Sequence, residues 1–289
     1  MGKKEPVRTT DFRLMKEKGQ KITMLTAYDC NMARLQDEAG VDSILVGDSV
    51  GMVMLGYDNT LPVTMEEILH HTRAVVRGVN RALVIADMPF MSFQVSPEKT
   101  VENAGRLLKE GGATAVKLEG GQEVLAQTRA LIAAGIPVLG HLGLTPQSIH
   151  QMGGFKVQAR AVAQAEKLIT DARLLEQAGV FGLVLECIPA PLAEKLSRSL
   201  SIPTIGIGAG SGCDGQVLVA HDLLGLSGDF APRFVRRYAD LGEAMQEGFS
   251  RYLAEVREGE FPGEKESFSM DQETLQKIFD REENSETNQ

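Results

Sequence analysis

Residues 42–49 read DSILVGDS and residues 181–187 read FGLVLEC, and each stretch contains a short, nearly continuous apolar run. Such runs are typical of parallel strands buried on both faces, whereas a half-solvated antiparallel strand alternates apolar and polar residues. Runs of this kind occur eight times along the chain, at Lys21–Asp29, Asp42–Ser49, Ala82–Pro89, Ala115–Gly121, Pro137–Gly143, Gly182–Ile188, Pro203–Gly210 and Gln216–Asp222. The pattern favours an α/β fold with a parallel sheet.

The segments between most of these runs carry helix signals. Residues 97–110 follow Ser96, a favourable N-cap, place Pro97 at the first helical position and end at Gly111. Other amphipathic stretches cover Thr64–Val79, Gln122–Ala134, Ala159–Ala178 and Pro191–Ser199. Eight repeats favour a (β/α)8 TIM barrel over a doubly wound sheet. A chain of 289 residues that is 43% hydrophobic can build such a barrel, which typically takes about 250 residues.

The domain organisation follows from this count. We expect residues 1–265 to form a single barrel domain with an N-terminal extension and C-terminal helices, one of them from Arg233 to Glu258. Residues 266–289 read as an acidic, polar tail, in which we expect one or two helical turns and a disordered end. Long loops follow the second and fifth runs, and barrels carry their function on loops at the carboxyl ends of strands.

Composition excludes several classes of partner. The net charge is -9 and no Lys or Arg cluster marks one face, which argues against nucleic-acid binding and favours small-molecule ligands. No apolar run approaches the roughly 18 residues that span a bilayer, and the first ten residues lack a signal-peptide pattern. The three cysteines are widely spaced without a CxxC pair, so we expect neither disulfides nor a zinc site, and a cytoplasmic location.

Charged side chains gather where the predicted strands end. Residues two apart on a strand share a face, so Lys117 and Glu119 point together while Val116 and Leu118 face the helices. Buried carboxylates need a cation, and oxygen ligands without thiolates select Mg²⁺ or Mn²⁺. The alternative is that each acid caps the following helix or pairs with an arginine. The charged residues at this rim are Asp48, Asp87, Lys117, Glu119, His141 and Glu186.

Glu186 has a different setting, because it follows the apolar run Gly-Leu-Val-Leu and precedes Cys187 and Ile188. Apolar surroundings disfavour the charged form of a carboxyl group, which would move its pKa towards the range useful to a general base. A glutamate that only caps a helix remains the alternative.

Residues 210–215 read GSGCDG and match the dinucleotide pattern GxGxxG. A dinucleotide-binding loop opens a helix, whereas here a strand-like run follows at once. We therefore interpret the segment as a tight turn at the barrel rim, with an anion-binding loop as the alternative.

Several longer motifs, among them VGDSVGMVMLGYDNTLPVT at 46–64 and GHLGLTPQS at 140–148, together resemble one enzyme family, ketopantoate hydroxymethyltransferase. The resemblance runs in order from about Thr10 to about Phe268, and one small departure is Ala159, where the family pattern leads us to expect glycine. The motifs that carry it are ITMLTAYD at 22–29, VGDSVGMVMLGYDNTLPVT at 46–64, ADMPFMS at 86–92, AVKLEGG at 115–121, GHLGLTPQS at 140–148, GGFKVQ at 153–158, LVLECIP at 183–189 and IGIGAG at 205–210.

The resemblance implies a barrel of the phosphoenolpyruvate/pyruvate superfamily type and a reaction in pantothenate biosynthesis. A hydroxymethyl group would pass from 5,10-methylenetetrahydrofolate to 3-methyl-2-oxobutanoate through an enolate stabilised by Mg²⁺, giving 2-dehydropantoate. It also implies a homo-oligomer, commonly a decamer of two rings.

Carried over by motif, the family's site residues fall on the charged rim. The catalytic base is Glu186, and His141 lies beside the substrate. The resemblance assigns the metal to Asp48, Asp87 and Glu119, and the keto acid to Asp48, Ser49, Asp87 and Lys117.

Two other functions stay open on the sequence. One is an enolate-forming lyase or mutase of the same superfamily that works without folate. The other is a barrel that binds an oxo acid without turnover and acts through a partner protein.

Overall fold

The computed structural model describes residues 5–228 and 232–286, with side chains described as far as residue 280. Contacts divide the chain into two compact units, Met1–Ala239 and Asp240–Gln289. The first unit contains all eight strands, and the second consists of the C-terminal helices.

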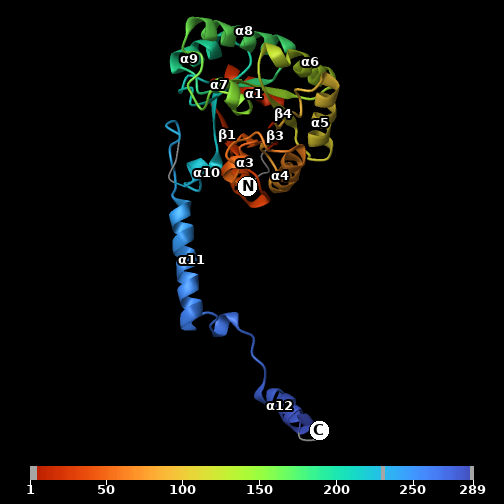
Figure 1. Cartoon of the computed structure of the whole chain (residues 1–289), viewed down its shortest axis with the longest axis vertical. Coiled ribbons are helices and arrows are strands. Elements are labelled where there is room, and N and C mark those ends of the chain that lie inside the picture. Colours follow the sequence, from red (N-terminus) through yellow and green to blue (C-terminus); the bar gives the residue numbers. More distant parts are fainter. Residues whose placement is uncertain (1–4, 229–231, 287–289) are drawn as a thin grey trace. The chain divides into compact units, whose positions relative to one another are not determined.

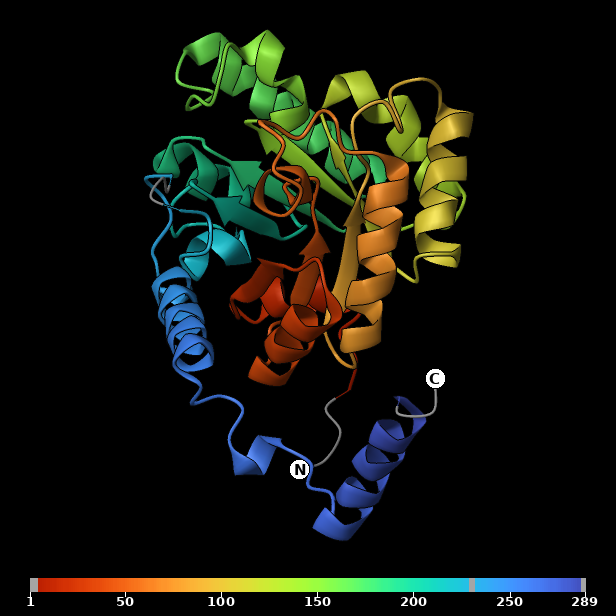
Figure 2. The ribbon, with the colours of Figure 1, turned by 60° about the horizontal axis from the view of Figure 1, so that its bottom comes forward.

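The first unit is a closed barrel of eight parallel strands in the order β1 to β8, with helices outside it (Figures 1 and 2). This confirms the predicted (β/α)8 fold: seven predicted runs contain one strand each, and the eighth overlaps a strand that begins one residue earlier, at Gly215. The strands are β1 Ile22–Thr26, β2 Ser43–Val46, β3 Leu83–Asp87, β4 Ala115–Glu119, β5 Val138–Gly143, β6 Gly182–Glu186, β7 Thr204–Ile207 and β8 Gly215–Leu218.

Each of the five helical stretches predicted for the barrel contains or overlaps a helix, whereas the helices Thr9–Glu17 and Cys30–Ala39 were not predicted. Ser96 accepts a hydrogen bond from the Lys99 N–H at the start of α5, and Thr64 and Glu67 form a reciprocal capping box at the start of α4. The helices of the barrel unit are α1 Thr9–Glu17, α2 Cys30–Ala39, α3 Val50–Val53, α4 Met65–Gly78, α5 Pro97–Lys109, α6 Leu125–Ala133, α7 Ile149–Met152, α8 Val162–Ala178, α9 Ala190–Ser199 and α10 Ala220–Leu223, with short 3-10 turns η1 Gln122–Val124 and η2 Pro146–Ser148.

The alternation of side chains along the strands builds two separate cores. Ala115 of β4 belongs to the inner cluster with Ile85, and Phe12 and Met15 of α1 add to it. Val116 and Leu118 instead belong to the cluster between strands and helices, as predicted. Lys117 and Glu119 therefore share the inner face with Ala115 but lie nearer the carboxyl end of the strand.

The Gly-rich segment 210–215 contains a turn at residues 211–212, as predicted, but the segment is not confined to the barrel rim. Because β7 and β8 are parallel neighbours, the chain must travel from the carboxyl end of β7 to the start of β8, and here no helix makes that crossing. The segment runs against α9, where a Cβ added at Gly210 would clash with Ala190 and one at Gly212 would clash with Glu194. The two glycines therefore allow the segment to pack closely against α9.

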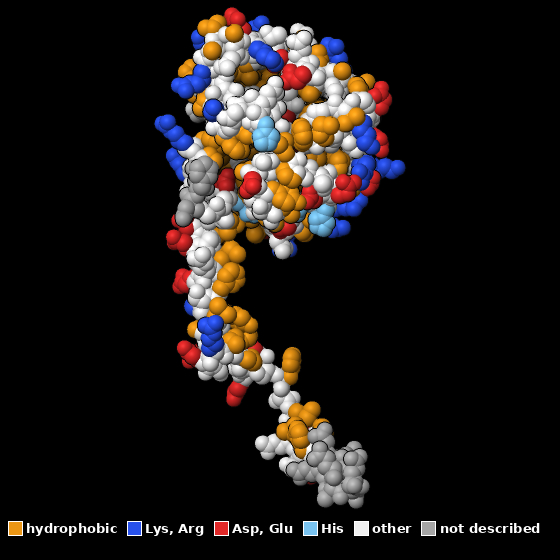
Figure 3. All heavy atoms as spheres, in the orientation of Figure 1, with side chains coloured by type: hydrophobic (Ala, Val, Ile, Leu, Met, Phe, Trp, Pro, Cys, Tyr) orange, Lys and Arg blue, Asp and Glu red, His pale blue; other side chains and the backbone are white. Residues whose placement is uncertain are grey.

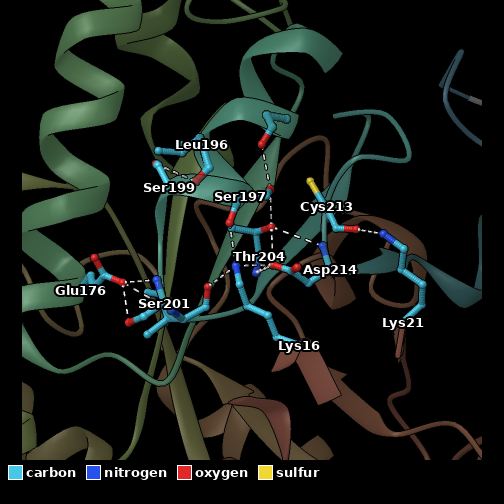
Figure 4. Close-up of polar contacts among 12 residues, drawn as sticks. Lys16, Lys21, Glu176, Leu196, Ser197, Ser199, Ser201, Thr204, Cys213 and Asp214 are labelled. Carbon is cyan, nitrogen blue, oxygen red and sulfur yellow. Dashed lines mark hydrogen bonds and ion pairs between the residues drawn. The ribbon is translucent and has the colours of Figure 1, made fainter. Parts of the chain in front are cut away.

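Polar contacts anchor the end of this crossing (Figure 4). Asp214 accepts hydrogen bonds from the Thr204 N–H at 2.8 Å and from the Lys16 ammonium of α1 at 2.9 Å. Lys16 also donates to the carbonyl oxygens of Ser197 and Ile202. These contacts lie at the amino-terminal end of the barrel, opposite the charged rim.

Three predicted boundaries near the C-terminus were wrong. Residues 220–222, predicted as the end of the last strand, begin α10. The helix predicted from Arg233 begins only at Leu241, as α11 Leu241–Glu258. The tail holds a 15-residue helix, α12 Gln272–Glu286, after the 3-10 turn η3 Glu264–Glu266, rather than one or two turns. The predicted disorder at the chain end falls partly on residues 287–289, which lie outside the described residues.

Acidic and basic side chains are interspersed over the visible face of the barrel, without a basic patch (Figure 3). In the described part of the chain, no helix is both long and apolar enough to cross a bilayer. Apolar side chains are exposed along one α11 stripe: Leu241, Met245, Phe249, Tyr252 and Val256.

Candidate active site

The structure brings the predicted charged residues together at the carboxyl ends of β2 to β6. Asp87 and Glu186 are the last residues of β3 and β6, and Asp48 follows β2 by two positions. In the strand register, Asp87 lies beside Lys117 and Glu119 lies beside His141. This is the end of the barrel at which such folds place their active sites.

Lys117 and Asp87 form a buried ion pair at the centre of this cluster. The Lys117 Nζ atom lies 2.7 Å from both Asp87 carboxylate oxygens and 3.7 Å from Glu119 Oε1. Burial opposes the charge on Lys117, but the Coulomb attraction of Asp87 and Glu119 outweighs it and raises the pKa of the ammonium. Lys117 is therefore a fixed positive charge inside the barrel mouth.

Asp48 lies beside this pair and, among the described residues, forms no ion pair of its own. Its backbone N–H donates to Asp87 Oδ2 at 3.2 Å. Burial, and then repulsion by Asp87 and Glu119, raises the pKa of Asp48 well above its usual range. The pKa of Asp87 is also raised, mainly by burial, although Lys117 opposes that shift. Burial thus disfavours the charged form of both aspartates, and at Asp48 the neighbouring acids add to this effect.

His141 joins the other two acids. Its Nδ1 lies 3.4 Å from Glu119 Oε1 and its Nε2 lies 3.1 Å from Glu186 Oε2, although neither nitrogen has a well-aligned hydrogen bond. Burial and the Lys117 charge favour neutral imidazole, but the two glutamates outweigh them and raise the pKa of His141 to about 9. Burial opposes the charge on Glu119, but His141 and Lys117 lower the pKa of its carboxyl group. His141 is therefore cationic near neutral pH.

Glu186 is the most accessible of these acids, with 14% of its side chain exposed. The next residue, Cys187, has a φ of +47°, in the left-handed region that non-glycine residues rarely adopt. The Glu186 and Cys187 carbonyl oxygens accept hydrogen bonds from the N–H groups of Leu144 and Gln158. The loop after β5 is thus tied to the end of β6, and Ala159 in that loop also has a positive φ of 55°.

Ser49 lies at the same rim, where its Oγ atom is 2.7 Å from the Tyr28 hydroxyl. Tyr28 is fully buried at the end of β1, and burial raises the pKa of its hydroxyl group, which stays neutral. The Nδ1 atom of His71 contacts the Tyr28 carbonyl oxygen at 2.7 Å. Tyr28 was not predicted as a site residue, because nothing in the run ITMLTAYD reveals that its hydroxyl reaches the next strand.

Sequence reasoning also missed Gln147, which lies in the motif GHLGLTPQS. Its backbone N–H donates to Glu119 Oε2 at 3.0 Å, and its side chain donates to Asp48 Oδ2 at 2.9 Å. The only signal in the sequence was the long loop after the fifth strand, which does not show where the glutamine side chain points.

The charges of this cluster fit a divalent cation. Four carboxylates face two cationic groups, Lys117 and His141, and the buried Glu119 Oε1 atom has no hydrogen-bond partner. Within the described residues, no three His, Cys, Asp or Glu side chains already surround one point as ligands. Mg²⁺ is commonly held by one or two carboxylates together with waters and substrate, so the hard oxygen donors present suit it.

Solved structures with the same fold are distant in sequence. Phosphoenolpyruvate phosphomutase from Streptomyces platensis subsp. rosaceus superposes with a TM-score of 0.59 at 15% identity, covering 97% of this chain and 96% of that one. A 2,3-dimethylmalate lyase of the PEP mutase/isocitrate lyase superfamily gives 0.56 at 17% identity, with 97% of each chain covered. Phosphonopyruvate hydrolase in complex with oxalate and Mg²⁺ superposes with a TM-score of 0.55 at 16% identity, and the match covers 96% of this chain and 97% of that one. These likenesses support the predicted barrel fold.

Sequence similarity is much closer to one family. The family model for ketopantoate hydroxymethyltransferase matches residues 6–264. The 3-methyl-2-oxobutanoate hydroxymethyltransferase of Clostridium novyi (strain NT) is 57% identical over 270 residues, 93% of this chain and 98% of the relative. The enzyme of the same name from Moorella thermoacetica is 58% identical over 268 residues, 93% and 100% of the two chains. The chain therefore belongs to the ketopantoate hydroxymethyltransferase family of enzymes.

Proposed function

We propose that this enzyme transfers a hydroxymethyl group from 5,10-methylenetetrahydrofolate to 3-methyl-2-oxobutanoate and forms 2-dehydropantoate for pantothenate biosynthesis. The observation that carries the proposal is one line of contacts at the barrel mouth. It joins a fixed cation, Lys117, to a partly exposed carboxylate, Glu186, through Glu119 and His141. A cation that binds an oxo acid and a base that takes its proton are the two groups that this reaction needs.

We propose Asp48, Asp87 and Glu119 as the residues that hold Mg²⁺. The raised pKa values of the two aspartates, and the Glu119 Oε1 atom that lies near Lys117 and His141 but accepts no hydrogen bond, support this assignment. When bound, the cation would act as a Lewis acid that polarises the carbonyl group of the oxo acid. A distant barrel of the same fold, phosphonopyruvate hydrolase, has been solved with Mg²⁺.

The oxo acid would be held by the residues around this site. Lys117 offers its ammonium group to the substrate carboxylate and needs only one Asp87 oxygen to stay paired. Ser49 offers a hydroxyl group oriented by Tyr28, and His141 offers a positive charge between the two glutamates. Asp48 and Asp87 would contact the same substrate from the metal side.

Glu186 is the proposed general base. It takes the proton from C3 of the oxo acid, and the electron pair of that C–H bond forms the enolate. The enolate carbon then bonds to the methylene carbon of the folate in its iminium form. Water would supply the hydroxyl group to that carbon as its bond to the folate nitrogen breaks, the remaining water proton would go to that nitrogen, and tetrahydrofolate would leave. The His141 charge 3.1 Å from Glu186 orients this carboxylate.

A folate-independent lyase or mutase is the second candidate, because barrels with those names share the fold. Their identity to this chain is only 15–17%, so they support the fold and not the reaction. The discriminating test is product formation from 3-methyl-2-oxobutanoate with Mg²⁺, with and without methylenetetrahydrofolate. We expect 2-dehydropantoate only when the folate is present, and cleavage or rearrangement of the oxo acid without folate would favour the lyase or mutase. A protein that binds the oxo acid without any turnover would instead be a sensor.

We also propose that the enzyme is a homo-oligomer, and the family resemblance implies a decamer. We further propose that it works in the cytoplasm. The exposed α11 stripe, in which Phe249 is 60% exposed, supports a protomer contact, because single soluble proteins rarely leave such a row uncovered. Light scattering on the whole protein tests this. We expect a mass several times that of one chain, and Phe249→Glu should lower it.

A further inference from the structure

Gln147 occupies a central place in the cluster that the proposed mechanism leaves without a task. It lies in η2, after β5, and is 5% exposed. Its side-chain nitrogen reaches Asp48 across 99 positions of sequence and also donates to the Met88 carbonyl oxygen at 2.9 Å. Its backbone N–H holds Glu119. One residue thus connects the carboxyl ends of β2, β3 and β4.

The orientation of the Gln147 amide is determined by its partners. Both hydrogens of Nε2 are directed at acceptors, Asp48 Oδ2 and Met88 O, and Oε1 accepts a hydrogen bond from Gln94 Nε2 at 3.3 Å. A flipped amide would place its oxygen against a carboxylate and a carbonyl, which repel it. The side chain therefore has one favourable arrangement, and it directs a donor at Asp48.

The neutrality of this donor is important. A lysine or arginine at the same position would also hold Asp48, but its charge would cancel the negative excess that attracts a cation. The glutamine holds two carboxylates in place and adds no charge, so the excess of negative charge around Asp48 remains. Partners that orient carboxylate ligands are known to affect metal affinity strongly.

We propose that Gln147 is a positioning residue that sets the orientation and separation of the Asp48 and Glu119 carboxylates for the divalent cation. This inference rests on the metal site of the proposed function, but not on the transfer of a one-carbon unit. Gln147 fixes Oδ2 of Asp48 and leaves Oδ1 for the cation. Gln94 donates a hydrogen bond to the Gln147 side-chain oxygen and so supports the Gln147 amide without itself bonding to either carboxylate.

The test measures Mn²⁺ binding by the whole protein through the electron paramagnetic resonance signal of free Mn²⁺. Gln147→Met keeps the length of the side chain and removes its donor, and we expect a Kd about 10- to 100-fold higher than that of the wild type. Gln94→Met leaves Gln147 in place and should raise the Kd by about threefold, as a more distant partner. Gln151→Met changes an exposed glutamine of α7 in the same segment and should bind like the wild type.

A second control separates positioning from general loss of stability. Thr128→Val removes a buried hydroxyl group whose hydrogen bond goes to Val124 on the outer layer. It should lower the Tm without changing the Kd for Mn²⁺. If Gln147→Met fails to fold, the Gln94→Met variant tests the proposal in its place. An unchanged affinity of that variant for Mn²⁺ would count against the proposal.

The outcomes distinguish this inference from the proposed function. If Gln147→Met folds and binds Mn²⁺ as tightly as the wild type, the positioning role is wrong. If the wild type binds no Mn²⁺, the metal site and the role of Gln147 fall together. If affinity falls as expected but no 2-dehydropantoate forms, Gln147 keeps its role and the transferase reaction is wrong.

Discussion

The Lys117 ammonium lies 2.7 Å from both carboxylate oxygens of Asp87, and neither side chain is more than 5% exposed. A pair buried this deeply is costly to form, yet removal of one partner leaves the other charge without compensation. The pair is therefore a fixed element of the site rather than a surface contact.

Lys117→Met should destabilise the protein by about 3 to 5 kcal/mol, because Asp87 stays buried without its cation. Urea unfolding in EDTA measures this loss. The control is Arg73→Met, which breaks an exposed pair with Glu110 at 3.1 Å and should cost less than about 1 kcal/mol. Equal losses in the two variants would contradict the account of the buried pair.

His141 should make stability depend on pH. Its folded pKa of about 9 lies above the usual 6.5, so its stabilisation is complete below about pH 6.5 and is lost as the pH rises through 9. The free energy of unfolding of the wild type should therefore exceed that of His141→Gln by an amount on the order of 2 kcal/mol, and this difference should shrink between pH 6.5 and 9. Urea unfolding at several pH values checks this, with His70→Gln on the exposed side of α4 as control. A constant difference would show that His141 does not gain a proton on folding.

Mg²⁺ should stabilise the folded protein, because a bound cation would offset the burial that raises the pKa of Asp48 and Asp87 and the repulsion that Asp87 and Glu119 add at Asp48. Saturation at 100 times the Kd corresponds to about 2.7 kcal/mol. The Tm should rise on addition of Mg²⁺ and return with EDTA. Asp87→Asn removes one proposed ligand and should reduce the rise in Tm that Mg²⁺ causes. If the Tm of the wild type does not change on addition of Mg²⁺, the result would argue against the metal site.

Tyr28→Phe should weaken binding of the oxo acid, since the hydroxyl group 2.7 Å from Ser49 is lost. One hydrogen bond is worth about 1 kcal/mol, so we expect KM to rise about fivefold with a smaller change in kcat. Tyr57→Phe is a matched control, because its hydroxyl group donates to Glu67 at the same distance. If both variants raise KM equally, Tyr28 has no specific role.

The sequence predicted the parts of this molecule that depend on local pattern. Apolar runs located all eight strands, because strands buried on both faces must be apolar. The period of two placed Lys117 and Glu119 on one face, and the structure confirms that they meet there. Strand ends then brought Asp87, His141 and Glu186 to one rim, since parallel strands share a direction.

The parts that failed depend on distant contacts. Gln147 bonds to Asp48 across 99 positions, which no local pattern reveals. The sequence of segment 210–215 suggested a turn confined to the barrel rim. In the structure the segment packs beside α9 on its way from the end of β7 to the start of β8. The start of α11 was placed at Arg233 instead of Leu241, because apolar spacing continues through a stretch that is not helical.

Deuterium incorporation at C3 of 3-methyl-2-oxobutanoate, followed by proton NMR in deuterated solvent, tests the central claim most directly. The measurement compares wild type and Glu186→Gln, each with Mg²⁺ and with EDTA, and without folate. We predict exchange by the wild type that requires Mg²⁺ and that falls by about a hundredfold or more in Glu186→Gln. Equal exchange by the variant would contradict the role of Glu186, and no exchange by the wild type would contradict the enolate mechanism itself.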